Sequence, residues 1–208
     1  MIITDKEQLL QKCEPCTSIK EGEEIGKQLI EEINNSEYSA AGLAANQIGI
    51  NKRVCVLNVK ELVVLINPEI IERSEDMFGF MEGCLSFPGE TIKTKRHKWV
   101  KVKADNHEQI LYFSVWNEDN ESGYNENDKL IYAFETACVQ HEIDHLDGII
   151  MYDRELILKP AKRDVPKIGR NQKVTIKKDG EVKVIKWKKA EKLLKEGWKL
   201  SDVQLQTH

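Results

Sequence analysis

The 208-residue sequence lacks any apolar run of about 18 residues, the length that a membrane-spanning helix requires. Its first segment, MIITDKEQLLQKCEPC, also lacks the basic region and apolar stretch of a signal peptide. Hydrophobic residues make up 40% of the chain and charged residues 32%, which is typical of a globular protein and excludes a disordered one. We therefore expect a cytoplasmic protein with one catalytic domain, either alone or with an appendage, and no membrane partner.

The five cysteines are an odd number in a chain without an export signal, which favours free thiols over a disulfide framework. Cys13 and Cys16 have the spacing of a redox or zinc pair, but no second pair accompanies them. We interpret them as two unrelated thiols. At least one of the five, which also include Cys55, Cys84 and Cys138, is a candidate metal ligand or nucleophile.

The net charge of −4 conceals an uneven distribution along the chain. Residues 1–154 carry 16 Lys and Arg against 28 Asp and Glu, whereas residues 155–208 carry 15 against 7. This asymmetry predicts a catalytic domain over residues 1–155 and a basic extension over 156–208. The extension either faces a polyanion or presents a solvated lysine-rich surface, and neither alternative implies sequence-specific DNA binding.

Apolar spacing predicts the elements of the first half of the chain. Apolar residues three and four apart indicate an amphipathic helix over 19–33. The β-branched runs 54–59 and 62–68 predict a hairpin, and the alternating stretch 99–104 is expected to pair with 110–116. Pro88-Gly89 is expected to break the chain between elements.

The second half begins with the acidic, aperiodic segment 117–128, which predicts an exposed loop. From Lys129 the apolar period becomes helical, and Gly148 supplies a stop signal. Two runs, 174–176 and 182–187, flank the turn residues 178–180 and predict a second hairpin. A short helix over about residues 188–196 is expected to follow it and to end at Gly197.

The predicted helix after Lys129 contains the pattern HEIDH over residues 141–145. His141 and His145 lie four residues apart, so both imidazoles project from one helical face and can bind a single ion. Glu142 can accept a proton from a water activated by the ion without being a ligand itself. A surface helix can match this pattern by accident, but the apolar flanks indicate a buried helix, where unpaired His and Glu are costly.

A catalytic ion needs a third protein ligand, and the downstream sequence offers poor candidates. A generic zinc peptidase would use a Glu or His there, but only Asp153, Glu155 and the terminal His208 are present. Upstream, Cys84 follows Gly83, which permits close backbone approach, and a bound metal would lower the pKa of the thiol. These residues favour a Cys-His-His site.

Three motifs, in this order, resemble those of the peptide deformylase family. G-x-G-L-A-A-x-Q appears as AAGLAANQ over residues 40–47, E-G-C-L-S is intact over 82–86, and Q-H-E-x-D-H-L-x-G is intact over 140–148. The resemblance spans roughly residues 5–155. It implies an α+β fold in which antiparallel sheets surround a central metal-binding HExxH helix, here with a basic hairpin-plus-helix extension at the carboxyl end.

The resemblance also implies the reaction, removal of the formyl group from N-formylmethionyl nascent peptides with release of formate. Cys84, His141 and His145 would then bind Fe²⁺, or alternatively Zn²⁺, Ni²⁺ or Co²⁺, and leave the fourth position for water. Glu142 would take a proton from the water and pass it to the leaving amine.

By the same resemblance, the side-chain amide of Gln47 and the backbone N–H of Leu85 would stabilise the oxyanion. The backbone of Gly42 would pair with the substrate peptide as a strand does. Motif position also nominates an apolar methionine pocket, although core packing explains its residues equally well. The pocket candidates are Ala41, Phe87, Phe134, Ala137 and Cys138.

Two positions depart from the family pattern. Ala40 replaces the first glycine of the first motif, which would cost about 1 kcal/mol if its φ had to be positive. Thr91 stands where some bacterial members have an arginine that contacts the substrate backbone, and Lys93, Lys95 or Arg96 is a candidate substitute.

Two functional alternatives remain. A generic zinc peptidase would need the missing downstream ligand. A catalytically inactive relative, kept as a ribosome-binding module, would leave the intact Cys84, Gln47 and Glu142 unexplained. In bacterial relatives a C-terminal helix is linked to ribosome docking, and the basic extension here offers a comparable contact to ribosomal RNA phosphates.

Overall fold

The structure is a computed structural model that describes residues 1–36, 39–115, 126–157 and 168–201. The chain forms two compact units, Met1–Ile157 and Leu158–His208. The first unit mixes helices with antiparallel sheets, so the expected α+β class is confirmed. Within the described residues, no helix has the length and apolar character needed to span a membrane.

The amino-terminal part contributes two helices, α1 (Lys6–Leu9) and α2 (Ile19–Asn35). The hydroxyl of Ser18 caps α2 by accepting a hydrogen bond from the backbone N–H of Glu21. The apolar stripe expected from the sequence is buried at Ile25, Leu29 and Ile33. This stripe packs against the first sheet, which confirms the predicted amphipathic helix.

The first sheet has the order β1-β2-β3, with all pairs antiparallel. Strands β2 (Val54–Asn58) and β3 (Leu62–Ile66) form the predicted hairpin. Strand β1 (Gly42–Ala44) lies at the edge of this sheet and leads directly into the 3₁₀ helix η1 (Ala45–Ile48). The first motif therefore forms an edge strand followed by a tight turn.

The second sheet has the order β4-β7-β8 and is also antiparallel. It contains β4 (Glu69–Arg73), β7 (Trp99–Lys103) and β8 (Leu111–Ser114). The predicted pairing of β7 with β8 is confirmed, whereas β4 has no counterpart among the predicted elements.

A long hairpin, β5 (Met77–Cys84) with β6 (Phe87–His97), carries the second motif at its tip. The expected chain break at Pro88-Gly89 is wrong, because both residues lie inside β6. The register shifts from Gly83–Thr91 to Cys84–Phe87, so residues 88–90 bulge out of the ladder. In a bulge the missing N–H of proline removes no ladder hydrogen bond, and Gly89 adopts a φ of 80°.

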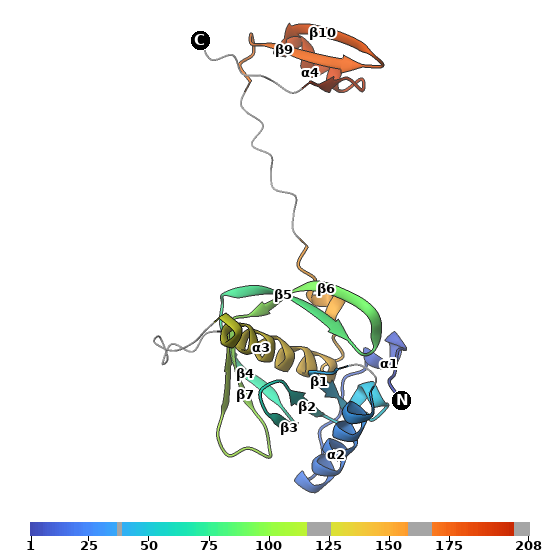
Figure 1. Ribbon diagram of the computed structural model, residues 1–208, viewed down its shortest axis with the longest axis vertical. Helices are drawn as coiled ribbons and strands as arrows, with labels where there is room; N and C mark the ends of the chain where they lie inside the picture. The colour runs from blue at the N-terminus through green and yellow to red at the C-terminus, as the bar shows by residue number, and fades with distance from the viewer. Residues whose placement is uncertain (37–38, 116–125, 158–167, 202–208) are drawn as a thin grey trace. The chain divides into compact units, whose positions relative to one another are not determined.

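Helix α3 (Glu126–Leu146) carries the third motif and ends near Gly148, whose φ is 71°. It contacts β1 and β2 on one side and β5 and β6 on another, and Figure 1 shows it between these two layers. Its apolar residues share a core with both three-stranded sheets. Most of the predicted acidic loop 117–128 lies outside the described residues, but 126–128 form the first turn of α3. A 3₁₀ helix, η3 (Met151–Arg154), follows.

In residues 168–201, the second unit contains a small sheet of order β10-β9-β11 and one helix. Strands β9 (Lys173–Lys178) and β10 (Glu181–Lys186) form the predicted hairpin, whose turn residues Asp179 and Gly180 both have positive φ. Helix α4 (Trp187–Leu194) and β11 (Lys199–Leu200) complete the unit. Its core consists of Val174, Ile176, Ala190 and Trp198.

Candidate metal centre and active site

Cys84 at the tip of β5 meets His141 and His145 on α3. The Sγ of Cys84 lies 3.3 Å from Nε2 of His145, and the two Nε2 atoms lie 3.2 Å apart. All three ligand atoms lie within 4.8 Å of one another. Ligands around a tetrahedral ion, bound at about 2.0–2.3 Å, are separated by about 3.3–3.6 Å. The three residues therefore fit a single metal ion.

The orientation of His141 is fixed from behind by Glu82. Nδ1 of His141 lies 2.9 Å from Oε2 of Glu82, so the ring donates its Nδ1 proton and turns Nε2 toward the other two ligands. Burial alone would raise the pKa of Glu82, but hydrogen bonds from Arg96 and His141 hold it at about 2. Glu82 is thus a permanent carboxylate partner for the ring.

The surroundings of the two histidines shift their pKa values in opposite directions. Burial lowers the pKa of His145 well below its ordinary value, which favours the neutral imidazole that a metal requires. Burial also acts to lower the pKa of His141, but hydrogen bonds with Cys84 and Glu82 raise it well above its ordinary value.

A buried ionic network supports Glu82. The guanidinium of Arg96 donates from Nε and Nη2 to the two oxygens of Glu82, at 2.6 and 2.7 Å, and from Nη1 to Asp144. Thr94 donates to Glu82 at 2.6 Å, and Arg154 donates to Asp144 at 2.7 and 3.0 Å. Because Arg96 is 2% exposed and fully engaged, its candidacy as a substrate contact is wrong. Lys93 and Lys95 are exposed, and neither lines the cavity described below.

Glu142 is the neighbouring carboxylate on α3, and it is 4% exposed. Its Oε2 has no hydrogen-bond partner among the described residues, and burial raises its pKa to about 7. An added Cβ at Gly42 would lie 2.6 Å from Oε1 of Glu142 and 2.9 Å from Sγ of Cys138. The glycine of the first motif therefore makes room for this carboxylate.

Gln47 is 2% exposed and reaches the same point from η1. Its Oε1 accepts the backbone N–H of Ala44 at 2.9 Å, which orients the amide. Its Nε2 then lies 3.4 Å from Sγ of Cys84 and 3.2 Å from Oγ of Ser86. Leu85 occupies the turn between β5 and β6 beside them.

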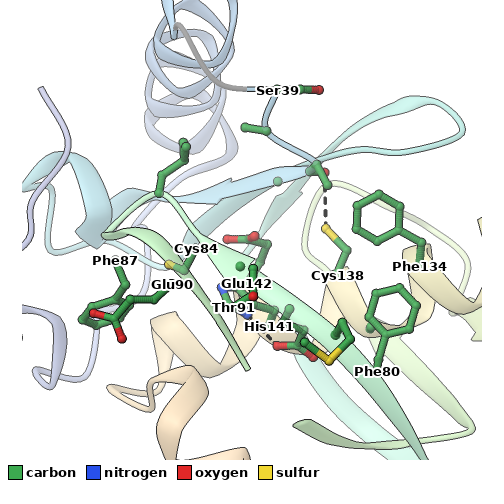
Figure 2. Close-up of a pocket in the computed structure, with 18 of the residues that line it drawn as sticks. Ser39, Phe80, Cys84, Phe87, Glu90, Thr91, Phe134, Cys138, His141 and Glu142 are labelled. Carbon is green, nitrogen blue, oxygen red and sulfur yellow. Dashed lines mark hydrogen bonds and ion pairs between the residues drawn. The ribbon is translucent and has the colours of Figure 1, made fainter. Parts of the chain in front are cut away.

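A cavity of about 420 Å³ opens beside these groups. Figure 2 shows Phe134 and Phe80 on one side of His141 and Glu142, and Phe87 and Glu90 on the other. Ala41 accepts a hydrogen bond from the thiol of Cys138 at 3.2 Å, and burial raises the pKa of that thiol well above its usual range. Gly42, Gln47 and Leu85 line the cavity. So does every residue expected in the methionine pocket, namely Ala41, Phe87, Phe134, Ala137 and Cys138.

These pocket candidates differ in burial. Phe87 is buried in a cluster with Leu9, Ile150 and Met151, so it serves core packing as well as the cavity. Phe134 is 42% exposed and stacks on Phe80 at a centroid distance of 5.7 Å.

Sequence reasoning missed five lining residues on the β5–β6 hairpin, since neither strand was predicted. Period-two alternation along β5 was the available signal, but the two glycines obscured it. The missed residues are Phe80, Met81, Pro88, Gly89 and Glu90.

Of the two departures from the family pattern, Ala40 carries no backbone strain. Among the described residues, the only non-glycine positions with positive φ are Asn67 and Asp179. The conformational free-energy cost considered for Ala40 therefore does not arise. Thr91 lines the cavity.

The Cys-His-His cluster beside a buried glutamate and a neutral amide donor fits the site of a metal-dependent amide hydrolase. The chain belongs to the polypeptide deformylase family, whose pattern matches residues 1–163. It is similar to the peptide deformylase of Heliobacterium modesticaldum, with 40% identity over 149 residues, which are 70% of this chain and 86% of that one.

Solved structures give the same result. The crystal structure of peptide deformylase from Thermotoga maritima has a TM-score of 0.59 and 31% identity, and the match covers 75% of this chain and 97% of that one. A probable peptide deformylase from Synechococcus phage S-SSM7 has a TM-score of 0.58 and 32% identity, covering 74% and 98%. The protein is accordingly a hydrolase that removes the formyl group from the amino-terminal methionine of nascent polypeptides.

Proposed function

We propose that Cys84, His141 and His145 hold the catalytic ion of this deformylase, and that Glu142 is its proton-transfer group. The observation that carries the proposal is the convergence of three ligand atoms within 4.8 Å, beside a buried carboxylate with an unpartnered oxygen. Fe²⁺ is the proposed ion in the cell, and the same ligand set accepts Zn²⁺, Ni²⁺ or Co²⁺. When bound, the ion supplies Lewis acidity that activates water and polarises the formyl carbonyl.

Glu142 is placed to move the proton. Its Oε2 accepts a proton from the attacking water and returns it to the amine nitrogen as the C–N bond breaks. The products are formate and a free amino-terminal methionine. Because Gly42 has no Cβ, which would lie 2.6 Å from Oε1 of Glu142, the carboxylate keeps its place in the cavity wall.

Two N–H groups are proposed to bind the formyl oxygen as negative charge develops on it. Nε2 of Gln47 is held near Cys84 because its partner Oε1 is already bound by Ala44. The backbone N–H of Leu85, one residue beyond Cys84, would donate to the same oxygen. Each such donor contributes about 10²–10³ in rate in comparable hydrolases.

The substrate peptide is proposed to lie along β1. Among the described strands, β1 pairs with β2 alone, so its other edge, which includes Gly42, is open to an added strand. The methionine side chain would then enter the cavity lined by Ala41, Phe134, Ala137 and Cys138, with Phe87 at the far wall. We assign the catalytic domain to residues 1–155, the basic extension to 156–208, and the site of action to the cytoplasm.

The test is formate release from a formyl-Met peptide by protein purified anaerobically and loaded with Fe²⁺ or Ni²⁺. Glu142→Gln should retain the ion but lose about 10²–10⁴ in kcat, because the proton acceptor is gone. Glu135→Gln is the matched control on the same helix: Glu135 pairs with Lys60 at 2.6 Å and does not line the cavity. The proposal fails if Glu142→Gln is as active as the control.

A further inference from the structure

The sheet of the second unit has two different faces. One face carries the buried Val174 and Ile176 and is covered by α4. The residues between them in the alternation point away from α4. Cross-strand register places the following residues together on this opposite face, which we call the lysine face: Lys173, Thr175, Lys177, Val182, Val184, Lys186 and Lys199.

Like charges stand directly opposite each other on the lysine face. Lys173 pairs in register with Lys186, and Lys177 pairs with Lys199. Directly opposed like charges destabilise a sheet, so this arrangement works against the fold of a small unit. A bound polyanion would remove the repulsion.

The lysine face carries no acidic residue. Within residues 168–201, none of its four lysines forms an ion pair. The acid closest to the face in the sheet, Glu181, pairs with Lys183 at 3.0 Å, and Lys183 lies over the ring of Trp198. Among residues 168–201, the ion pair of the sheet therefore lies on the α4 side.

We propose that the lysine face binds double-helical RNA through its phosphates, without sequence preference. Along β9, Lys173 and Lys177 are separated by about 13 Å, and each has its cross-strand lysine about 5 Å away. The face therefore presents two pairs of lysines, one for the phosphates of each RNA strand. The face has no aromatic residue on which an unpaired base could stack. Val182 and Val184, 55% and 63% exposed, lie on the edge strand β10 of this face.

RNA is favoured over an anionic membrane for two reasons. The two valines offer little apolar area for insertion, and no Trp, Phe or Leu of the described residues lies on the face. The enzyme's substrate is a nascent polypeptide, which emerges from the ribosome, and the ribosomal surface is rich in RNA phosphates. This second reason rests on the deformylase function.

The experiment measures fluorescence anisotropy of a labelled 20-base-pair RNA duplex with the full chain, at salt concentrations from 50 to 200 mM. With about four phosphate contacts, affinity should fall about 100-fold over this range. Replacing Lys173, Lys177, Lys186 and Lys199 together with Gln should weaken binding at least about 30-fold at 50 mM salt. The control instead replaces four exposed lysines on α4 and at its C-cap, with the same change in charge, and should lose less than about threefold in affinity. These are Lys188, Lys189, Lys192 and Lys195.

Deformylation of a free formyl-Met tripeptide should be unchanged in both quadruple variants, so a failure of the proposed reaction is seen separately from a failure of RNA binding. Equal losses in the two quadruple variants would mean that net charge alone attracts RNA, and would overturn the proposal. Wild-type affinity in the lysine-face variant would do the same. Tighter binding to phosphatidylserine vesicles than to the duplex would replace RNA with a membrane.

Discussion

Arg96→Met should destabilise the catalytic unit more than any surface charge removal. Arg96 is 2% exposed and donates to both Glu82 and Asp144. Asp144 keeps Arg154, but Glu82 loses its only cation of fixed charge. Removing one partner of a buried ion pair costs about 3–5 kcal/mol. The pKa of Glu82, lowered from 4.5 to about 2, corresponds to about 3 kcal/mol by itself.

The assay is thermal unfolding by calorimetry. A loss of about 3–5 kcal/mol lowers Tm by about 6–20 °C in a unit of this size. Lys98→Met is the control, because its pair with Asp76 is largely exposed and should contribute under about 1 kcal/mol. Since a lowered pKa stabilises the fold above pH 4.5 and this contribution is lost as pH falls toward 2, the difference between wild type and Arg96→Met should narrow in acid. If the Tm of Arg96→Met lay within about 2 °C of the control's Tm, the reasoning would be refuted. Such a difference corresponds to a loss of stability of less than about 1 kcal/mol.

Three further predictions concern the site. In metal-free protein, iodoacetamide should label Cys84 at least about tenfold faster than the other thiols. The reason is that burial raises the pKa of Cys13 to about 11 and also raises the pKa values of Cys16, Cys55 and Cys138. Loading with Ni²⁺ should then protect Cys84, and a labelling rate that Ni²⁺ does not change would count against Cys84 as a ligand. Gly42→Ala should lower kcat/KM at least about tenfold by pushing Glu142 from its place, and activity within twofold of wild type would contradict the contact at 2.6 Å. Glu90 lines the cavity, whereas no Lys or Arg of the described residues does so. The kcat/KM of formyl-Met-Lys peptides should therefore be about two- to fivefold higher than that of formyl-Met-Glu peptides, and Glu90→Gln should abolish the difference.

The helix that carries His141 and His145 was predictable because its signal is local. His141 and His145 share a face by helical spacing alone, and the β9–β10 turn follows from Asp179-Gly180 chemistry. Cys84 required a search across the sequence, since nothing local connects it to α3.

The buried ionic network could not be predicted, because its members are far apart in the chain. Arg96 stands in a lysine-rich stretch that suggests solvent exposure, and only the pairing of β5 with β6 brings it to Glu82. The cavity wall at Phe80 and Glu90 was missed for the same reason, since the Pro88-Gly89 bulge resembles a chain break in sequence.

X-ray absorption of Ni²⁺- or Fe²⁺-loaded protein tests the proposed centre most directly. The wild type should show one sulfur at about 2.3 Å and nitrogen or oxygen ligands at about 2.0–2.1 Å, and Cys84→Ser should lose the sulfur. A wild-type ion without a sulfur ligand, or a sulfur that survives Cys84→Ser, would contradict the assignment of Cys84, His141 and His145 as the metal site.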